Sequence, residues 1–240
     1  MPIGRRRNRI DRSLRERGVP PEPQVREREV PGTEGPWDAA DVPADGIPRI
    51  DLGSLRLPAA SGMELRVDVN AQQQVVGATL RLGESMLQVS AFAAPRAAGI
   101  WDDVRSEIIR SASGQGGSLR EVPGPFGTEL AGQVLIAPAV APGAPPVAPV
   151  RRPARFIGVD GPRWFLRGML TGPAAADPAQ AAALEEAFRA VVVVRGTAAM
   201  PVRDQLPLTL PPQAAEQVAR HQAAAKKTQG PRPAPGQAPA

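Results

Sequence analysis

The chain has 240 residues with no cysteine, one histidine and only 3% aromatic residues. The absence of cysteine excludes disulfides, thiolate nucleophiles and cysteine-ligated metal centres. The formal net charge of +5 is unevenly placed, because residues 1–30 carry nine arginines against five acids and residues 211–240 carry four basic residues against one acid. The middle of the chain is nearly neutral, so any weak nucleic-acid contact is expected through the basic ends.

The 29 prolines and 24 glycines gather at both ends and near position 145. Residues 1–35 are predicted to be a disordered basic tail, residues 36–210 a single domain, and residues 211–240 a disordered tail rich in Pro, Ala and Gln. No stretch reaches the roughly 18–20 apolar residues of a membrane span, and no apolar run follows the basic start as in a signal peptide. We expect a soluble, cytoplasmic protein without membrane contact.

Strand patterns begin at Ile50 and dominate the first half of the predicted domain. Residues 63–69 alternate between apolar and charged side chains, which is typical of a half-buried strand. The links to the next two strands are too short to cross over to a parallel neighbour, so an antiparallel meander is expected. The predicted elements are strands at 50–52, 55–57, 63–69, 75–82 and 85–92, then a helix at 100–112 with an apolar stripe of Trp101, Val104, Ile108 and Ala112.

The second half predicts two further strands, at 118–122 and 128–136, and a second helix. Residues 137–149 contain five prolines and no charge, which predicts a stiff, extended surface loop. Asp177 before Pro178 is typical of a helix start. Asp caps the helix, and proline is tolerated in the first turn because backbone N–H groups there have no partner within the helix. Residues 191–194 either continue this helix or form a short buried strand.

Residues 155–172 are predicted to be a hairpin around which the domain is organised. Asp160-Gly161 separates two apolar runs and is typical of a tight hairpin turn. Alternation along the second strand places Trp164, Leu166 and Leu170 on one face and Arg163, Phe165, Arg167 and Met169 on the other. The first face is expected to be buried, and the second to be open to a helix, a partner or a ligand. The fold class is therefore α+β, an antiparallel sheet packed by two helices.

Three segments carry a resemblance to a known family: Gly-Pro-Trp-Asp at 35–38, Arg-Phe-Ile-Gly-Val-Asp-Gly-Pro-Arg-Trp-Phe-Leu-Arg-Gly at 155–168, and Val-Val-Val-Val-Arg-Gly at 191–196. They resemble the actinobacterial family called domain of unknown function 3710, over about residues 35–211. The resemblance implies no activity. The order of strands and helices is also similar to the Mog1/PsbP-like sandwich, a largely non-enzymatic class, which is an analogy of fold alone.

The sequence contains few residues suited to catalysis or metal binding. The single histidine, His221, lies in the C-terminal tail, so we expect no metal site, no cofactor and no base for a serine nucleophile. Asp102 and Asp103 are adjacent on the predicted helix and point in different directions, so they are interpreted as acids of its first turn. No catalytic residue is predicted, and an enzyme is less expected than a binding protein.

Arg163, Phe165 and Arg167 are the predicted binding residues, because guanidinium groups bind carboxylates and phosphates through paired hydrogen bonds. The alternative is a solvated strand face whose arginines pair with cross-strand acids. We expect a non-catalytic binding or adaptor module with an unknown protein partner. Two alternatives stay open: an enzyme or carrier that holds a small anionic ligand with Arg163 and Arg167, and nucleic-acid association through the basic tails.

Overall fold

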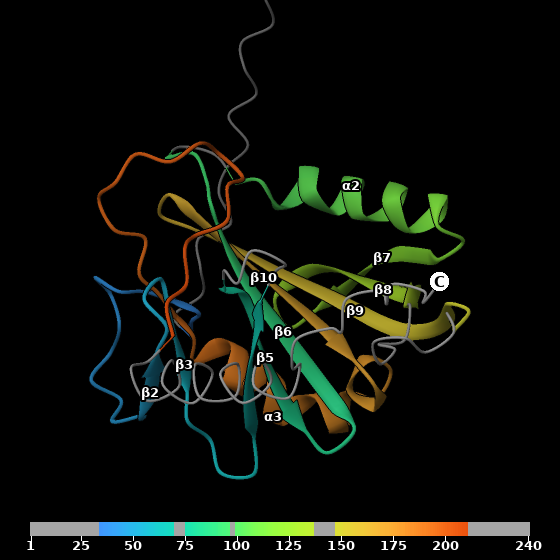
Figure 1. Cartoon of the computed structure of the whole chain (residues 1–240), viewed down its shortest axis with the longest axis horizontal. Helices are drawn as coiled ribbons and strands as arrows, with labels where there is room; N and C mark the ends of the chain where they lie inside the picture. The colour runs from blue at the N-terminus through green and yellow to red at the C-terminus, as the bar shows by residue number, and fades with distance from the viewer. Residues whose placement is uncertain (1–33, 70–74, 97–98, 137–146, 211–240) are drawn as a thin grey trace, which may run out of the picture.

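The computed structural model describes residues 34–69, 75–96, 99–136 and 147–210. Two sheets and two α-helices make up this part of the chain, which confirms the α+β class (Figure 1). The seven-stranded sheet has the order β4-β5-β6-β10-β9-β8-β7, and all of its neighbours are antiparallel. Its strands are β4 (Glu64–Val69), β5 (Val75–Leu82), β6 (Ser85–Ala93), β7 (Ser118–Gly124), β8 (Gly127–Ile136), β9 (Val150–Gly161) and β10 (Trp164–Thr171).

The main core lies on the face of this sheet that carries Trp164, Leu166 and Leu170, as the alternation predicted. Helix α3 (Pro178–Arg189) covers that face, and it begins as predicted, with the Asp177 side chain accepting a hydrogen bond from the Ala179 N–H. The short 3-10 helix η1 (Pro173–Ala175) leads into it. Trp164 is fully buried, so burial of this face is the main source of stability for the hairpin.

The turn of the central hairpin lies two residues later than predicted. Trp164 pairs with Gly161, so Pro162 and Arg163 form the turn and Asp160 belongs to strand β9. Arg163 has a φ of 64°, and proline followed by a residue of positive φ is the pattern of a type II turn. The Asp-Gly prediction was wrong because Pro162, which fixes φ near −65°, starts the turn more effectively.

A second sheet of four strands, which the sequence analysis did not predict, packs beside the main core. Its order is β1 (Trp37–Asp38), β11 (Val192–Val193), β3 (Leu55–Pro58) and β2 (Arg49–Asp51). Strand β11 settles the open alternative for residues 191–194 in favour of a short strand, and its pairing with β1 is parallel. The Asp38 carboxylate accepts a 2.7 Å hydrogen bond from the Trp164 indole, which connects this sheet to the central hairpin.

Helix α2 (Trp101–Gly114) lies on the opposite face of the large sheet from α3 (Figure 1). Asp160 holds its first turn, because the carboxylate accepts hydrogen bonds from the backbone N–H groups of Ile100 (2.9 Å) and Trp101 (3.1 Å). A side chain at Gly99 would clash with this carboxylate. The helix therefore starts where strand β9 presents an acid, and Trp101 is its one buried residue.

Three predictions concern residues outside the described ranges. The two tails lie almost wholly in residues 1–33 and 211–240, and the proline-rich loop lies mostly in residues 137–146. Their predicted disorder and extension stay predictions. The domain boundaries at 36 and 210 also stay predictions.

Candidate functional site

Three aromatic rings stack on the α2 face of the sheet, and an arginine lies at each end of the stack. Phe165 is buried between Trp101, 5.5 Å away, and Phe92, 6.1 Å away, measured between ring centroids. The guanidinium carbon of Arg105 lies 5.4 Å from the Trp101 centroid, and that of Arg167 lies 5.2 Å from the Phe92 centroid. Both distances are within the range of cation–π attraction.

The two arginines differ in their polar partners. Arg105 forms ion pairs with Asp102 at 2.6 Å and with Glu121 at 3.0 Å. Arg167 is half-buried, and within the part of the chain that the structure describes its guanidinium makes no hydrogen bond or ion pair. Burial lowers the pKa of Arg167. A ring face attracts the charge but leaves the N–H donors of the guanidinium without acceptors among the described residues.

The nearest polar groups on this face do not neutralise Arg167. Ser90 lies directly opposite it on β6 and is almost fully buried. Asp68 belongs to β4, but its side chain reaches across β5 toward β6, where one carboxylate oxygen lies over Gly77 on the same side as the Ser90 hydroxyl. Its carboxylate already accepts hydrogen bonds from Thr79 at 3.0 Å and Gln88 at 2.9 Å. The alternative interpretation of the sequence, an arginine paired with a cross-strand acid, therefore does not describe Arg167 among the described residues.

The other two predicted binding residues occupy different positions. Phe165 shares the α2 face with Arg167, but it is buried in the aromatic stack and supports the site from below. Arg163 lies in the hairpin turn, before β10 begins, and its carbonyl accepts hydrogen bonds from Ala94 and from the Arg195 side chain. The structure thus brings Phe165 and Arg167 together and sets Arg163 apart. A binding role for all three stays a prediction.

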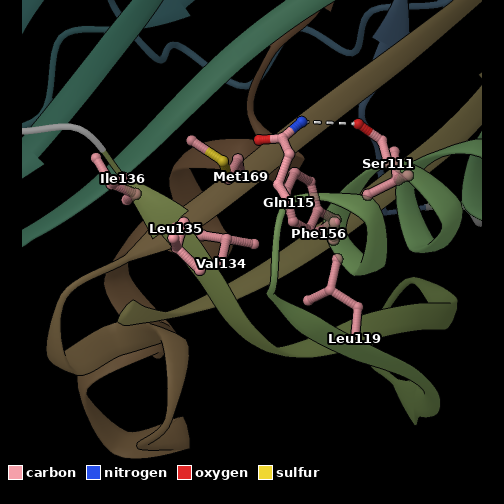
Figure 2. A pocket seen from close by; sticks show the side chains of 10 residues that line it. Ser111, Gln115, Leu119, Val134, Leu135, Ile136, Phe156 and Met169 are labelled. Carbon is pink, nitrogen blue, oxygen red and sulfur yellow. Dashed lines mark hydrogen bonds between the residues drawn. The ribbon is translucent and has the colours of Figure 1, made fainter. Parts of the chain in front are cut away.

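A pocket of about 440 Å³ opens beneath the C-terminal half of α2, next to this face. It is formed by α2 and the strands β7 to β10 (Figure 2). The space remains unfilled because the side chains at the end of the helix, such as that of Ala112, are too short to reach the sheet. Its lining residues are Ile108, Ser111, Ala112, Gln115, Leu119, Val134, Leu135, Ile136, Phe156 and Met169. The volume is within the range of small-ligand sites.

The lining of the pocket is apolar apart from two side chains. Ser111 and Gln115 supply its polar atoms, and the Gln115 amide donates a 3.1 Å hydrogen bond to the Ser111 hydroxyl (Figure 2). None of the ten lining residues carries a charge. The sequence analysis did not predict this pocket, although the small residues at the end of the helix are a signal that the helix packs incompletely there.

The opposite face contains a charged cluster that the sequence analysis also missed. Arg155 on β9 donates hydrogen bonds of 2.5 Å to both Glu129 and Glu185, and all three side chains are nearly buried. Burial disfavours the charge of Arg155, but the hydrogen bonds to Glu129 and Glu185 outweigh this effect and raise the pKa of Arg155. Both carboxylates are hydrogen-bonded to the one guanidinium, so this cluster joins α3 to the sheet and is not a candidate binding site.

The described ranges, 34–69, 75–96, 99–136 and 147–210, offer neither a metal-ligand cluster nor a membrane-spanning helix. They contain no group of three His, Cys, Asp or Glu residues placed to hold a metal ion. None of the helices in these ranges is both long and apolar enough to cross a membrane.

Comparison with known proteins gives a family but no activity. A family model described as a protein of unknown function, DUF3710, matches residues 35–217. This span includes the three segments that carry the resemblance and extends slightly beyond the predicted limit of residue 211. No curated protein and no solved structure matches the chain. Because the family model covers well over half of the sequence, the chain belongs to the DUF3710 family of proteins of unknown function.

Proposed function

We propose that this domain is a non-catalytic binding module that holds an organic anion at Arg167, on the α2 face of the large sheet. The observation that carries the proposal is the half-buried guanidinium of Arg167, which has an aromatic ring beneath it and no acidic partner among the described residues. A half-buried charge without a counter-ion is costly, and a bound anion removes that cost.

Comparison with other arginines of the domain supports this assignment. Arg155 and Arg105 are each paired with two carboxylates, and Arg49 with one. Arg167 is also shielded from water, and burial lowers its pKa. Unlike the other three, it has no carboxylate partner among the described residues. Its planar fork can grip a carboxylate with two parallel hydrogen bonds, which contribute about 1.5–3 kcal/mol when one partner is charged.

The residues around Arg167 favour binding over catalysis. Its neighbours on the same face include Ser90, Phe92 and Met169, which offer a hydroxyl and apolar surface. Two acids on this face, Asp68 and Asp160, are already hydrogen-bonded to other groups. Proton transfer near neutral pH needs a group whose pKa lies near the working pH, and the side chains of Ser90, Phe92 and Met169 have none. We therefore assign Arg167 to holding a ligand.

The anion has two possible sources, a small molecule or an acidic group of a protein partner. Native mass spectrometry of the protein purified from its own host distinguishes them by mass. Arg167→Ala is expected to keep its melting temperature and lose the bound species, while Arg167→Lys retains part of it because a point charge cannot reproduce the planar fork.

Arg56→Ala is the matched control, since it removes the same charge from an exposed side chain on the small sheet. If Arg167→Ala and Arg56→Ala retain the bound species equally, the anion does not bind at Arg167 and the proposal is wrong. If Arg167→Ala loses folding together with binding, Arg167 is a structural residue.

A further inference from the structure

We infer that the ligand is an aliphatic carboxylate, with its carboxylate on Arg167 and its hydrocarbon chain in the pocket beneath α2. This inference rests on the proposed function, because it names the class of anion that Arg167 holds. It is carried by three features: the positions of Arg167 and the pocket-lining Met169 two residues apart on one face of strand β10, the apolar lining of the pocket, and the charge of Arg167.

Strand β10 connects the two sites. Arg167 and Met169 are two residues apart, so their side chains point to the same face of the sheet and leave the backbone about 7 Å from each other. Met169 lines the pocket, whereas Arg167 lies outside it over Phe92. A ligand that reaches both must therefore have a polar end and an apolar body in line, as a carboxylate with a hydrocarbon chain does.

The lining favours a hydrocarbon chain over a peptide. A peptide brings an N–H and a C=O group with every residue, and each needs a partner when it is removed from water. Ser111 and Gln115 are the polar lining residues, and they are already hydrogen-bonded to each other. An alkyl chain makes no such demand, and flexible side chains such as Met169 adapt to its shape.

The charge of the site selects the head group. No lining residue is charged, and among the described residues Arg167 forms no ion pair, so its guanidinium is open to a ligand carboxylate. The Asp68 carboxylate on this face is already held by Thr79 and Gln88. A cationic amphiphile would be repelled by Arg167, and an alcohol would leave the guanidinium without an acceptor for most of its donors. The preference expected is therefore carboxylate first, alcohol second and quaternary ammonium last.

The test is isothermal titration of the full chain with hexanoate, octanoate and decanoate below their micelle concentrations. If the chain enters the pocket, affinity rises by about fourfold for each added methylene, as expected for burying apolar area. Decanol and decyltrimethylammonium serve as head-group controls and are expected to bind more weakly than decanoate.

Ala112→Phe fills the pocket from the α2 side and is expected to lower decanoate affinity at least tenfold while hexanoate changes little. The matched control is Ser113→Phe, which adds the same ring to the exposed side of the helix, outside the lining. If Ala112→Phe does not fold, Ala112→Leu fills less of the space and is expected to give a smaller loss of the same kind.

The outcomes separate the two proposals. If Arg167→Ala weakens all three acids equally while chain length and Ala112→Phe have no effect, the pocket inference is wrong and the proposed function stands. If Arg167→Ala binds decanoate as the unaltered chain does, the anion is not held at Arg167 and both are wrong. Equal binding of decanoate and decyltrimethylammonium also overturns the inference, because the head group is then not recognised.

Discussion

Strands β9 and β10 are neighbours, and each carries a half-buried arginine, but the two arginines lie on opposite faces of the sheet. Arg155 faces helix α3 and is held by Glu129 and Glu185. Arg167 faces the α2 side and rests on the ring of Phe92, and it forms no ion pair among the described residues. The pKa of Arg155 is raised by its partners despite burial, whereas burial lowers the pKa of Arg167.

This difference follows from how each face is covered. The α3 face is closed by a helix and by the small sheet, so every charge left inside needs a partner. Trp101 is the one residue of helix α2 that is buried, and a pocket lies below the C-terminal half of the helix. The α3 face therefore provides stability, whereas the α2 face keeps a guanidinium without an ion pair among the described residues and an unfilled apolar pocket, where we propose that a ligand binds.

The largest effect is expected on the closed face, from Trp164→Ala. The side chain is fully buried and its indole N–H bonds to Asp38, so the variant is expected to lose about 3–5 kcal/mol of unfolding free energy. Urea denaturation measures this loss. Trp164→Phe keeps most of the volume and is expected to lose less. An unchanged transition for Trp164→Ala would show that this face does not carry the stability.

The second prediction compares the two arginines directly. Arg155→Met leaves two carboxylates buried without a cation and is expected to cost about 3–5 kcal/mol of unfolding free energy. Arg167→Met removes a half-buried charge that has no acidic partner among the described residues, so we expect a change within about 1 kcal/mol. Matched denaturation curves of the two variants check this difference. Similar losses in both would contradict the assignment of Arg167 to binding.

A smaller effect is expected where α2 begins. Asp160→Ala removes the acceptor of two backbone N–H groups and is expected to cost about 0.5–2 kcal/mol, as for other helix caps. Hydrogen exchange should speed up in the first turn of α2 and not in α3. Asp160→Asn keeps one oxygen acceptor and is the control. Equal acceleration in both helices would mean that Asp160 supports the whole domain and not α2 alone.

The smallest effect concerns the ion pair between Asp45 and Arg49, which belongs to neither face. The hydrogen bonds from the Arg49 side chain and the Ile47 N–H lower the pKa of Asp45 to about 2. Since the pKa is lowered on folding, the contribution of this carboxylate is present above its unfolded pKa and is lost as the pH falls toward 2. An NMR titration of Asp45 measures the value. Arg49→Gln is expected to raise it toward 3.8, and no change would show that Arg49 is not the cause.

Much of the fold could be predicted from the sequence because the signals are local. Period-two alternation located strands such as β4, and it also placed Trp164 and Arg167 on opposite faces of β10. The start of α3 followed from Asp177 and Pro178, which act within one helical turn. These features depend on residues that are neighbours along the chain.

The tertiary structure alone decided which charges have partners. Glu129, Arg155 and Glu185 are far apart in the sequence and meet only after β8, β9 and α3 have packed. Asp160 was predicted to form a turn and instead holds the start of α2, some 60 residues earlier in the chain. Whether Arg167 is paired depends likewise on strands that the chain brings together only on folding. Alternation determined which way Arg167 points, and the packing of distant segments determined that none of the described acids forms an ion pair with it.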